Sequence, residues 1–227
     1  MEKIELTILM PCLNEEKTIG ECIKEARKFI DENGVKAEIL IADNGSIDAS
    51  AQIAIDNGAR VISVEEKGYG NALIGGIKQA KGKYVIMGDC DMSYDFYNLN
   101  GFLDELRQGN KLVMGNRFAG GIEKGAMPFS HKYIGVPFLS WLGRVKYKTK
   151  IKDFHCGLRG FDREAALFLG LKCEGMEFAT EIIGKFAKSG AKIVQIPTVL
   201  RKDGRGMPSH LNTLRDGMRH LLYLFKN

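Results

Sequence analysis

Two carboxylates stand one residue apart directly after a short apolar run. The run from Lys83 to Met87 contains β-branched residues and predicts a buried strand, and Gly88-Asp89-Cys90-Asp91 follows it. Because acidic side chains are rarely found inside a core, we expect both carboxylates at the rim of a sheet. Paired carboxylates at such a rim are hard oxygen ligands suited to Mg²⁺ or Mn²⁺, and a divalent metal recruits phosphate. The simpler alternative for an isolated Asp-x-Asp is a loop start or a helix cap.

The composition is that of a soluble globular protein with room for one sizeable core. The chain has 227 residues, of which 44% are hydrophobic and 27% are charged. Its five cysteines form no Cys-x-x-Cys pair, which disfavours a zinc site or a disulfide framework and favours a reducing, cytoplasmic setting. We expect neither a signal peptide nor a membrane span of roughly 20 apolar residues. The net charge of +5, with most arginines after residue 116, predicts an anionic partner such as phosphate, nucleic acid or lipid head groups.

Apolar runs and helical periodicity alternate along the first half of the chain. This alternation predicts an α/β fold with a mostly parallel central sheet, right-handed crossovers and flanking helices. The expected strands are 4–10, 38–42, 60–64, 83–89 and 111–115. The helices between them end near residues 30, 57, 80 and 107, and the last of these begins at about 96. Asn14 is expected to cap the first helix, and Ser46 or Asp48 the second.

Polar residues follow four of these strands at the point where each strand ends. Pro11, Asp43, Lys67 and Asp89 would therefore gather along one edge of the sheet. Glycines after Lys67 would let backbone N–H groups approach phosphate, although the spacing matches neither a dinucleotide-binding fingerprint nor a Walker loop. We interpret the four strand ends as one nucleotide-diphosphate and metal site.

The second half of the chain is more basic. Arg117 directly follows a strand, and the glycine-rich segment 118–128 predicts a mobile loop near the site. Segment 130–148 predicts either an ordinary amphipathic helix or a basic surface helix that faces an anionic partner. Asp153 would be a site carboxylate or a turn residue, and Asp162 would cap a short helix.

The C-terminal part of the sequence predicts a helix at 177–188, a strand at 192–196 and a last helix with an apolar stripe at 211–225. The basic, glycine-broken segment 200–210 would be a flap over a phosphate. The stripe of the last helix would pack on its own domain or lie on an anionic membrane surface.

In this order and spacing, the motifs resemble the family 2 glycosyltransferases of the GT-A fold, and more narrowly the polyprenyl-phosphate (dolichol-phosphate) sugar synthases. The resemblance extends from Ile4 to about Phe225. The matching segments are Pro11 to Glu15, Asp43 to Asp48, Lys67 to Gly76, Asp89 to Asp91, Gly115 to Phe118, Lys152 to Phe161 and Pro197 to Ser209.

The resemblance implies a role for each matching position. Pro11, Asn14 and Glu15 would line a nucleoside pocket, and Asp43 would contact the base. Lys67 and Gly68 would lie near the ribose and diphosphate. Asp89 and Asp91 match the metal motif for Mg²⁺ or Mn²⁺, with Asp91 the more direct ligand. The positions implied for phosphates and the acceptor are Arg117, Arg201, Arg205 and the acidic Asp153. Two departures are Asn44, where a second Asp is common, and His131-Lys132, where an Arg is expected.

The resemblance implies inverting transfer of a hexose from a nucleotide-diphosphate sugar, of the UDP-glucose or GDP-mannose class. A polyprenyl or dolichyl phosphate acceptor is already anionic, and the cluster of Arg117, Arg201, Lys202 and Arg205 favours it, with His131 and Lys132 as further phosphate contacts. A hydroxyl acceptor would need a general base, for which Asp153 is the candidate. Two alternatives remain. A nucleotidyltransferase usually needs an N-terminal glycine-rich loop, which this sequence lacks. A nucleic-acid-binding module is disfavoured by the acidic pair, which would repel phosphate.

We expect one GT-A catalytic domain over residues 1–227. Its parts would be a nucleotide-sugar-binding half at 1–115, an acceptor half at 116–209 and a C-terminal amphipathic helix at 210–227. The expected setting is cytoplasmic, with peripheral contact at the inner face of the membrane and no nucleic-acid partner.

Overall fold

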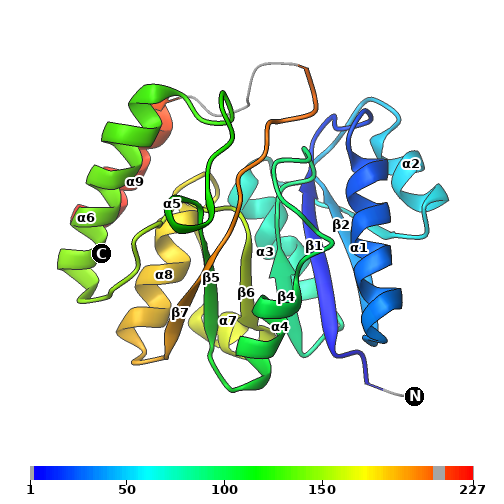
Figure 1. Ribbon diagram of the computed structural model, residues 1–227, viewed down its shortest axis with the longest axis horizontal. Coiled ribbons are helices and arrows are strands. Elements are labelled where there is room, and N and C mark those ends of the chain that lie inside the picture. Colours follow the sequence, from blue (N-terminus) through cyan, green and yellow to red (C-terminus); the bar gives the residue numbers. More distant parts are fainter. Residues whose placement is uncertain (1–2, 207–212, 227) are drawn as a thin grey trace.

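Helices cover both faces of a central sheet in a computed structural model that describes residues 3–206 and 213–226 (Figure 1). Within these residues the sheet has seven strands in the order β3-β2-β1-β4-β6-β5-β7. The pairs β1 with β2, β2 with β3, β1 with β4, and β5 with β7 are parallel, whereas β6 is antiparallel to both of its neighbours. The predicted α/β fold with a mostly parallel sheet is therefore confirmed.

The strands are β1 Leu6–Cys12, β2 Ala37–Asp43, β3 Arg60–Ser63, β4 Tyr84–Met87, β5 Leu112–Asn116, β6 Arg159–Asp162 and β7 Ile193–Pro197. The helices are α1 Ile19–Asn33, α2 Ser50–Asp56, α3 Tyr69–Gln79, α4 Asn100–Arg107, α5 Arg117–Gly120, the π-helical turn η1 His131–Gly135, α6 Val136–Tyr147, α7 Arg163–Leu169, α8 Phe178–Lys188 and α9 Thr213–Lys226.

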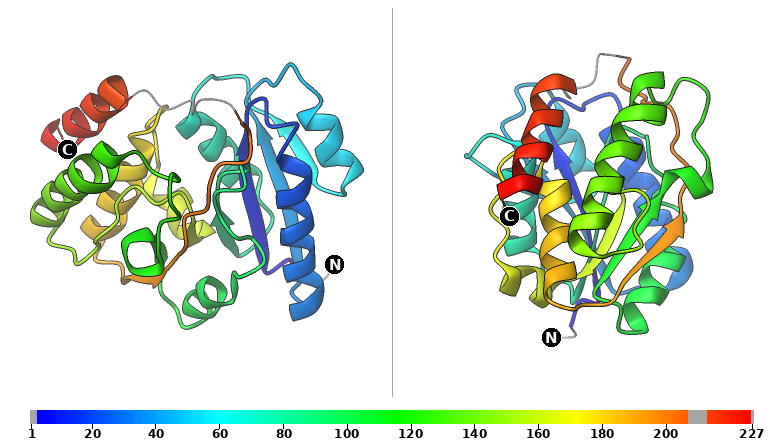
Figure 2. Two further views of the ribbon diagram at one scale, coloured as in Figure 1. Left: turned by 45° about the horizontal axis from the view of Figure 1, so that its top comes forward. Right: turned by 90° about the vertical axis from the view of Figure 1, so that its left-hand side faces the viewer.

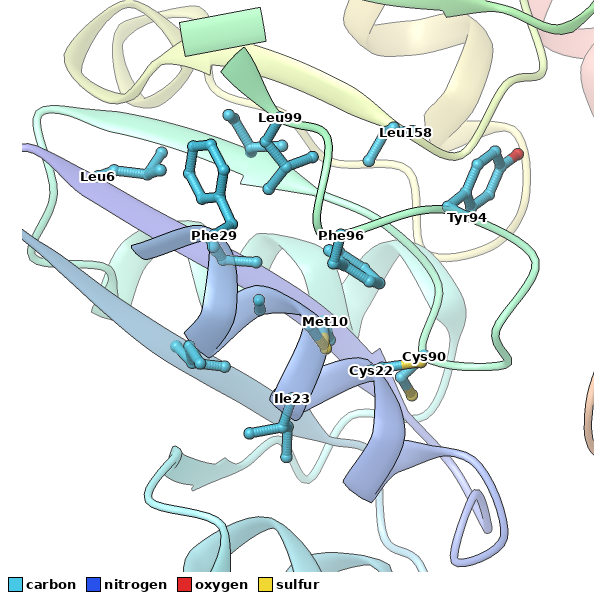
Figure 3. Close-up of a cluster of buried hydrophobic side chains, with 14 of the residues drawn as sticks. Leu6, Met10, Cys22, Ile23, Phe29, Cys90, Tyr94, Phe96, Leu99 and Leu158 are labelled. Carbon is cyan, nitrogen blue, oxygen red and sulfur yellow. The ribbon is translucent and has the colours of Figure 1, made fainter. Parts of the chain in front are cut away.

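Each face of the sheet buries its own apolar cluster. On one face, α1 and α4 pack over β1 and β4, and Figure 3 shows Phe29, Phe96 and Leu99 meeting Leu6 and its neighbours there. On the other face, α3, α7 and α8 bury a second cluster, to which α6 and α9 add side chains. Because both faces are covered, the central strands are nearly continuous apolar runs, as a mostly parallel sheet requires.

Three local predictions are wrong. The sequence did not predict β6, whose residues Arg159–Asp162 enter the sheet between β4 and β5. Asn14 does not cap α1, which begins at Ile19; its backbone has a φ of 58° and its Oδ1 accepts a hydrogen bond from Ile47 N at 2.9 Å. The helix expected from 96 begins at Asn100. By contrast, the predicted cap Asp162 does accept a hydrogen bond from Ala165 N, at 3.0 Å.

The last helix packs on the domain through polar side chains. Within α9, the buried residues are Asp216, His220 and Leu224, whereas Leu214, Met218, Leu222 and Phe225 of the predicted stripe are exposed. His220 Nδ1 lies 2.8 Å from Thr180 Oγ1 of α8, and its ring meets His155 edge-on at 4.6 Å. Leu211 and the end of the predicted flap, 207–210, lie outside the described residues. Among those described, no helix is both long enough and apolar enough to cross a membrane.

Replacing His220 with Gln should reduce the acid sensitivity of the fold. Burial lowers the pKa of His220 to about 4, with Glu177 and Asp216 opposing this shift and Arg159 and Arg219 adding to it. The unfolded chain takes up this proton near pH 6.5, so the folded state loses stability as the pH falls from 6.5 towards 4. Between pH 7 and 4, wild type should lose about 3 kcal/mol more free energy of unfolding than the variant. Urea unfolding at each pH measures the free energy of unfolding. Equal losses in wild type and variant would contradict the lowered pKa of His220 as the cause of the acid sensitivity.

Candidate functional site

The strand ends predicted to form one site do lie together. In the register of the sheet, Cys12 at the end of β1 pairs with Asp43 at the end of β2. Cys90 Sγ lies 3.1 Å from Pro11 O, which brings the chain after β4 against the end of β1. Lys67 Nζ donates to Asn44 O at 2.7 Å, so the loop after β3 joins the same edge. These ends lie at the top of the sheet in Figure 1.

Asn44 fastens the loop before α3 to β2. Its Nδ2 donates to Val64 O at 3.0 Å and to Glu66 O at 2.8 Å, and its Oδ1 accepts from Gly68 N at 2.8 Å. A carboxylate could not make the two donor contacts, so the departure from Asp at this position has a structural cause. Gly68 has a φ of 136°, and a Cβ there would clash with Glu174 O. Gly68 thus lets the loop before α3 lie directly against the backbone of Glu174.

Asn14, Glu15 and Asp43 are held by the facing loop at 45–50. Asn14 N donates to Ser46 Oγ at 2.9 Å, and Glu15 N donates to Ser50 Oγ at 2.7 Å. Asp43 Oδ1 accepts from Ser46 N at 3.2 Å. These contacts fix a polar rim beside the end of β1, where Pro11 is half-buried.

Both carboxylates of the acidic pair are half-buried after the end of β4. Asp89 Oδ1 accepts from Tyr69 Oη at 2.9 Å, and a Cβ at Gly157 would clash with Asp89 Oδ2. Burial, together with the nearby charge of Asp91, raises the pKa of Asp89 to about 6. Asp91 Oδ1 accepts from Ser93 N at 3.0 Å, and its Oδ2 faces Arg205 at 3.3 Å.

Arg205 neutralises the acidic end of the site. Its buried guanidinium lies 3.0 Å from Glu15 Oε1, pairs with Asp91, and donates from Nε to Asp203 Oδ2 at 2.8 Å. Burial raises the pKa of Glu15 to about 7, and Arg205 opposes this shift. The segment that carries Arg205 also contacts the loop after β4, because Gly204 N donates to Asp91 O at 2.8 Å. The described part of the predicted flap, 201–206, thus lies over the acidic pair.

Arg201 and Lys202 point away from Arg205. Arg201 forms ion pairs of 2.8 Å with Glu25 of α1 and 2.7 Å with Asp95. Lys202 is exposed, and its backbone N–H donates to Glu123 Oε2 at 3.0 Å. Arg201 therefore ties the segment to α1.

Arg117 and Asp153 form a buried ion pair. Arg117 Nε donates to Asp153 Oδ2 at 2.7 Å and its terminal nitrogen to Oδ1 at 2.8 Å, while the side chain of Asp153 is 0% exposed. Oδ2 also accepts from Arg117 N at 3.1 Å, and Oδ1 from His155 N at 3.2 Å. The pair joins the start of α5 to the loop before β6.

His131 and Lys132 lie in η1. His131 Nε2 is 2.9 Å from Thr213 Oγ1 of α9, and Lys132 Nζ lies over the ring of Tyr133. Within 3–206 and 213–226, no hydrogen bond or ion pair joins either residue to Asp89 or Asp91.

Sequence reasoning missed several side chains that shape the site. Tyr69 donates to Asp89, Tyr94 Oη accepts from Gly157 N at 2.7 Å, and Asp203 pairs with Arg205. All three stand within or beside segments that the motifs singled out. Arg159 is 1% exposed and donates to the carbonyl oxygens of Phe154, Cys156 and Ala179 at 3.1, 2.7 and 2.9 Å. It thereby braces the loop that carries Asp153 and Gly157.

Comparison with known proteins identifies the family. The model of "Glycosyl transferase family 2" matches residues 7–168, so the chain belongs to glycosyl transferase family 2. The low-salt glycan biosynthesis hexosyltransferase Agl6 of Haloferax volcanii is 35% identical over 98% of this chain, which spans 53% of Agl6. The dolichyl-phosphate hexose transferase of the same organism is 29% identical over 87% of this chain and 83% of its own. The predicted resemblance is confirmed at the level of the family.

A solved structure with the same fold is that of glucosyl-3-phosphoglycerate synthase from Mycobacterium tuberculosis, in complex with Mn²⁺, UDP and phosphoglyceric acid. Its TM-score is 0.77 at 23% identity, over 98% of this chain and 78% of the other. The predicted GT-A fold is therefore confirmed.

Arg159→Ala should destabilise the protein strongly, because it leaves three buried carbonyl oxygens without their donor. We expect a loss of about 3 to 5 kcal/mol in the free energy of unfolding, measured in urea. Arg163→Ala is the matched control, since Arg163 also bonds two carbonyls but is partly exposed. Equal losses in both variants would argue against Arg159 as the brace.

Proposed function

We propose that this chain transfers a hexose, with inversion, from a nucleotide-diphosphate sugar to a polyprenyl or dolichyl phosphate, using Mg²⁺ or Mn²⁺. The observation that carries the proposal is the acidic cluster of Asp89, Asp91 and Glu15 at the sheet edge, with Arg205 over it. Family membership supports sugar transfer, and the name of the dolichyl-phosphate hexose transferase supports the acceptor class.

The donor would lie along the ends of β1 and β2. Pro11, Asn14 and Glu15 would line the nucleoside pocket, with Asp43 beside the base. Lys67 and Gly68 would approach the ribose and diphosphate, while the missing side chain of Gly68 leaves room for the backbone of Glu174. The mycobacterial synthase, which shares the fold, is solved in complex with UDP, and this supports a nucleotide donor. The donor would be of the UDP-glucose or GDP-mannose class.

The residues fit a hard divalent metal. Asp91 presents a carboxylate oxygen whose cationic neighbour is Arg205, and Asp89 lies two residues away. Among the described residues, no group of three or more His, Cys, Asp or Glu could hold a metal. Two carboxylates plus substrate phosphates are the usual set for Mg²⁺. When bound, the metal would neutralise the leaving diphosphate as a Lewis acid.

The chain's own residues would orient the acceptor phosphate. An acceptor oxygen that is already anionic needs positioning more than deprotonation. Arg117 is held rigidly by Asp153, so it would present a fixed cation beside the strand ends. Arg205 would contact phosphate near Asp91, while Arg201 would anchor the segment and Lys202, His131 and Lys132 would add positive charge. The bond from the anomeric carbon to the diphosphate would break as the acceptor oxygen attacks from the opposite face.

A sugar hydroxyl acceptor, with Asp153 as general base, is the alternative. Both oxygens of Asp153 accept hydrogen bonds and its side chain is fully buried, which favours an anchoring role for it. The deciding experiment incubates the protein and Mn²⁺ with a panel of labelled sugar nucleotides and either polyprenyl phosphate or free sugars. Label in the lipid phase supports the proposal, and label only in oligosaccharide would replace it with the alternative.

The proposed setting is cytoplasmic, at the inner face of the membrane, because a polyprenyl phosphate is held in a bilayer. Peripheral contact with that surface would bring the donor from solution to the lipid phosphate. The basic character of the chain after residue 116 supports this setting.

Asp91→Ala should abolish metal-dependent turnover and weaken Mn²⁺ binding at least about tenfold, because the more direct carboxylate is lost. The fold should persist, since Arg205 keeps its ion pairs with Glu15 and Asp203. Electron paramagnetic resonance of free Mn²⁺ measures binding, and Asp104→Ala on the exposed face of α4 is the control. An Asp91→Ala protein that is still active in chelator-treated buffer would contradict the role of Asp91 as a metal ligand.

A further inference from the structure

Two helices at one end of the molecule carry apolar stripes that face away from the core. On η1 and α6 the exposed side chains are Ile134, Phe138, Trp141 and Val145, and on α9 they are Leu214, Met218, Leu222 and Phe225. Spacings of three and four place each set on one side of its helix. The buried residues of α6, Ser140, Gly143 and Tyr147, and those of α9 lie on the opposite sides. Each helix is therefore amphipathic with its apolar stripe turned outward.

The two stripes belong to one surface. α6 and α9 each contact α8 and also contact one another. Figure 2 shows them side by side at the end of the molecule, with α9 in red and α6 in green. Lys146 Nζ donates to Leu224 O and ties the two helices together. Because both helices pack on α8 from outside, their outer stripes form a single face, which we call the α6–α9 face.

The α6–α9 face is bordered by positive charge. Segment 124–152 contains seven Lys and Arg and no Asp or Glu. Lys148, Lys150 and Lys152 at its end are exposed. In α9 the acidic Asp216 is buried, whereas Arg215 and Lys226 are exposed. Apolar bulk with basic flanks is the pattern of helices that lie in the interface of an anionic bilayer.

A groove lies on the α6 side of this face. It has a volume of about 730 Å³, with Phe118, Pro137, Trp141 and Val145 among its apolar lining residues. Arg144, Lys150 and Lys152 add cations. Phe118 adjoins Arg117 and Lys152 adjoins Asp153, so the face is continuous with the residues proposed to orient the acceptor.

Charge decides between a bilayer and a second copy of the chain. If two copies met through their α6–α9 faces, the lysines and arginines of one copy would lie against those of the other. Segment 124–152 has no acidic residue that could form ion pairs with them. A bilayer that contains anionic lipid offers both the apolar phase and the opposite charge.

We propose that the α6–α9 face docks on an anionic membrane surface, with Trp141 and the α9 stripe in the headgroup and acyl boundary. This proposal rests on the proposed function, because it names the surface through which the enzyme would reach a lipid-borne acceptor. The docked face would set the groove beside Phe118 at the level of the acyl chains.

Trp141 reports the docking directly, because it is the sole tryptophan of the chain and is 49% exposed. The protein is mixed, without donor or acceptor, with vesicles of phosphatidylcholine or of phosphatidylcholine and phosphatidylglycerol. With anionic vesicles we expect a blue shift of Trp141 emission, quenching by brominated acyl chains, and flotation of the protein with the vesicles. Added salt should weaken the binding.

Two paired variants test the residues. Lys148→Gln/Lys150→Gln should weaken binding about thirtyfold, because each cation near an anionic surface contributes about fivefold. Lys24→Gln/Lys28→Gln on α1, at the other end of the molecule, should change binding less than about twofold (Figure 1). Leu222→Gln/Phe225→Gln should reduce both binding and quenching, whereas Ile55→Gln/Phe168→Gln, also exposed, should not.

The outcomes separate this proposal from the proposed function. Binding without quenching of Trp141, equal effects of the paired lysine variants, or self-association in place of vesicle binding would overturn the docking surface. Sugar transfer to a short, water-soluble prenyl phosphate tests the reaction independently of any bilayer. Transfer without vesicle binding would refute only the docking, and vesicle binding without transfer would refute only the proposed reaction.

Discussion

The structure depends on balancing the negative charge that three carboxylates bring to one end of the sheet. Glu15 is buried and Asp89 is half-buried, and each has a raised pKa because removal from water disfavours its charge. Arg205 supplies the opposing charge from a segment almost two hundred residues later in the chain. Since buried charges need partners, the acidic end can exist without a ligand only while this segment lies over it. The same acids would accept a metal and a diphosphate when the donor binds.

A second buried ion pair gives the other half of the site its rigidity. Arg117 and Asp153 satisfy one another, and the loop that carries Asp153 is fixed by the guanidinium of Arg159. This arrangement supplies a positioned cation without an exposed base, which suits an acceptor that is already anionic. The groove is lined by Phe118 and Lys152, the sequence neighbours of Arg117 and Asp153. The proposed acceptor and the proposed membrane surface therefore depend on one structural element.

Local sequence patterns predicted the alternating elements and the strand ends. They could not predict contacts between segments that are far apart in the chain. The strand β6 was missed because its four residues include Arg159 and Gly160, and its antiparallel place between β4 and β5 is set by the whole sheet. The motifs placed Arg205 and Asp91 among the candidate site residues, but they could not predict the ion pair that joins the two. In α9, periodicity found the apolar stripe but left open which way it faces, because the polar His220 that occupies the buried side gives no apolar signal.

The central claim is that Asp89 and Asp91 seat the metal that binds the donor diphosphate. The most direct measurement is a crystal structure of the protein grown with Mn²⁺ and a nucleoside diphosphate, with data collected at the manganese absorption edge. The account predicts an anomalous peak in contact with the Asp91 carboxylate and a diphosphate oxygen, with the nucleoside beside Asp43. A manganese peak elsewhere, or a nucleotide bound away from the ends of β1 and β2, would contradict it.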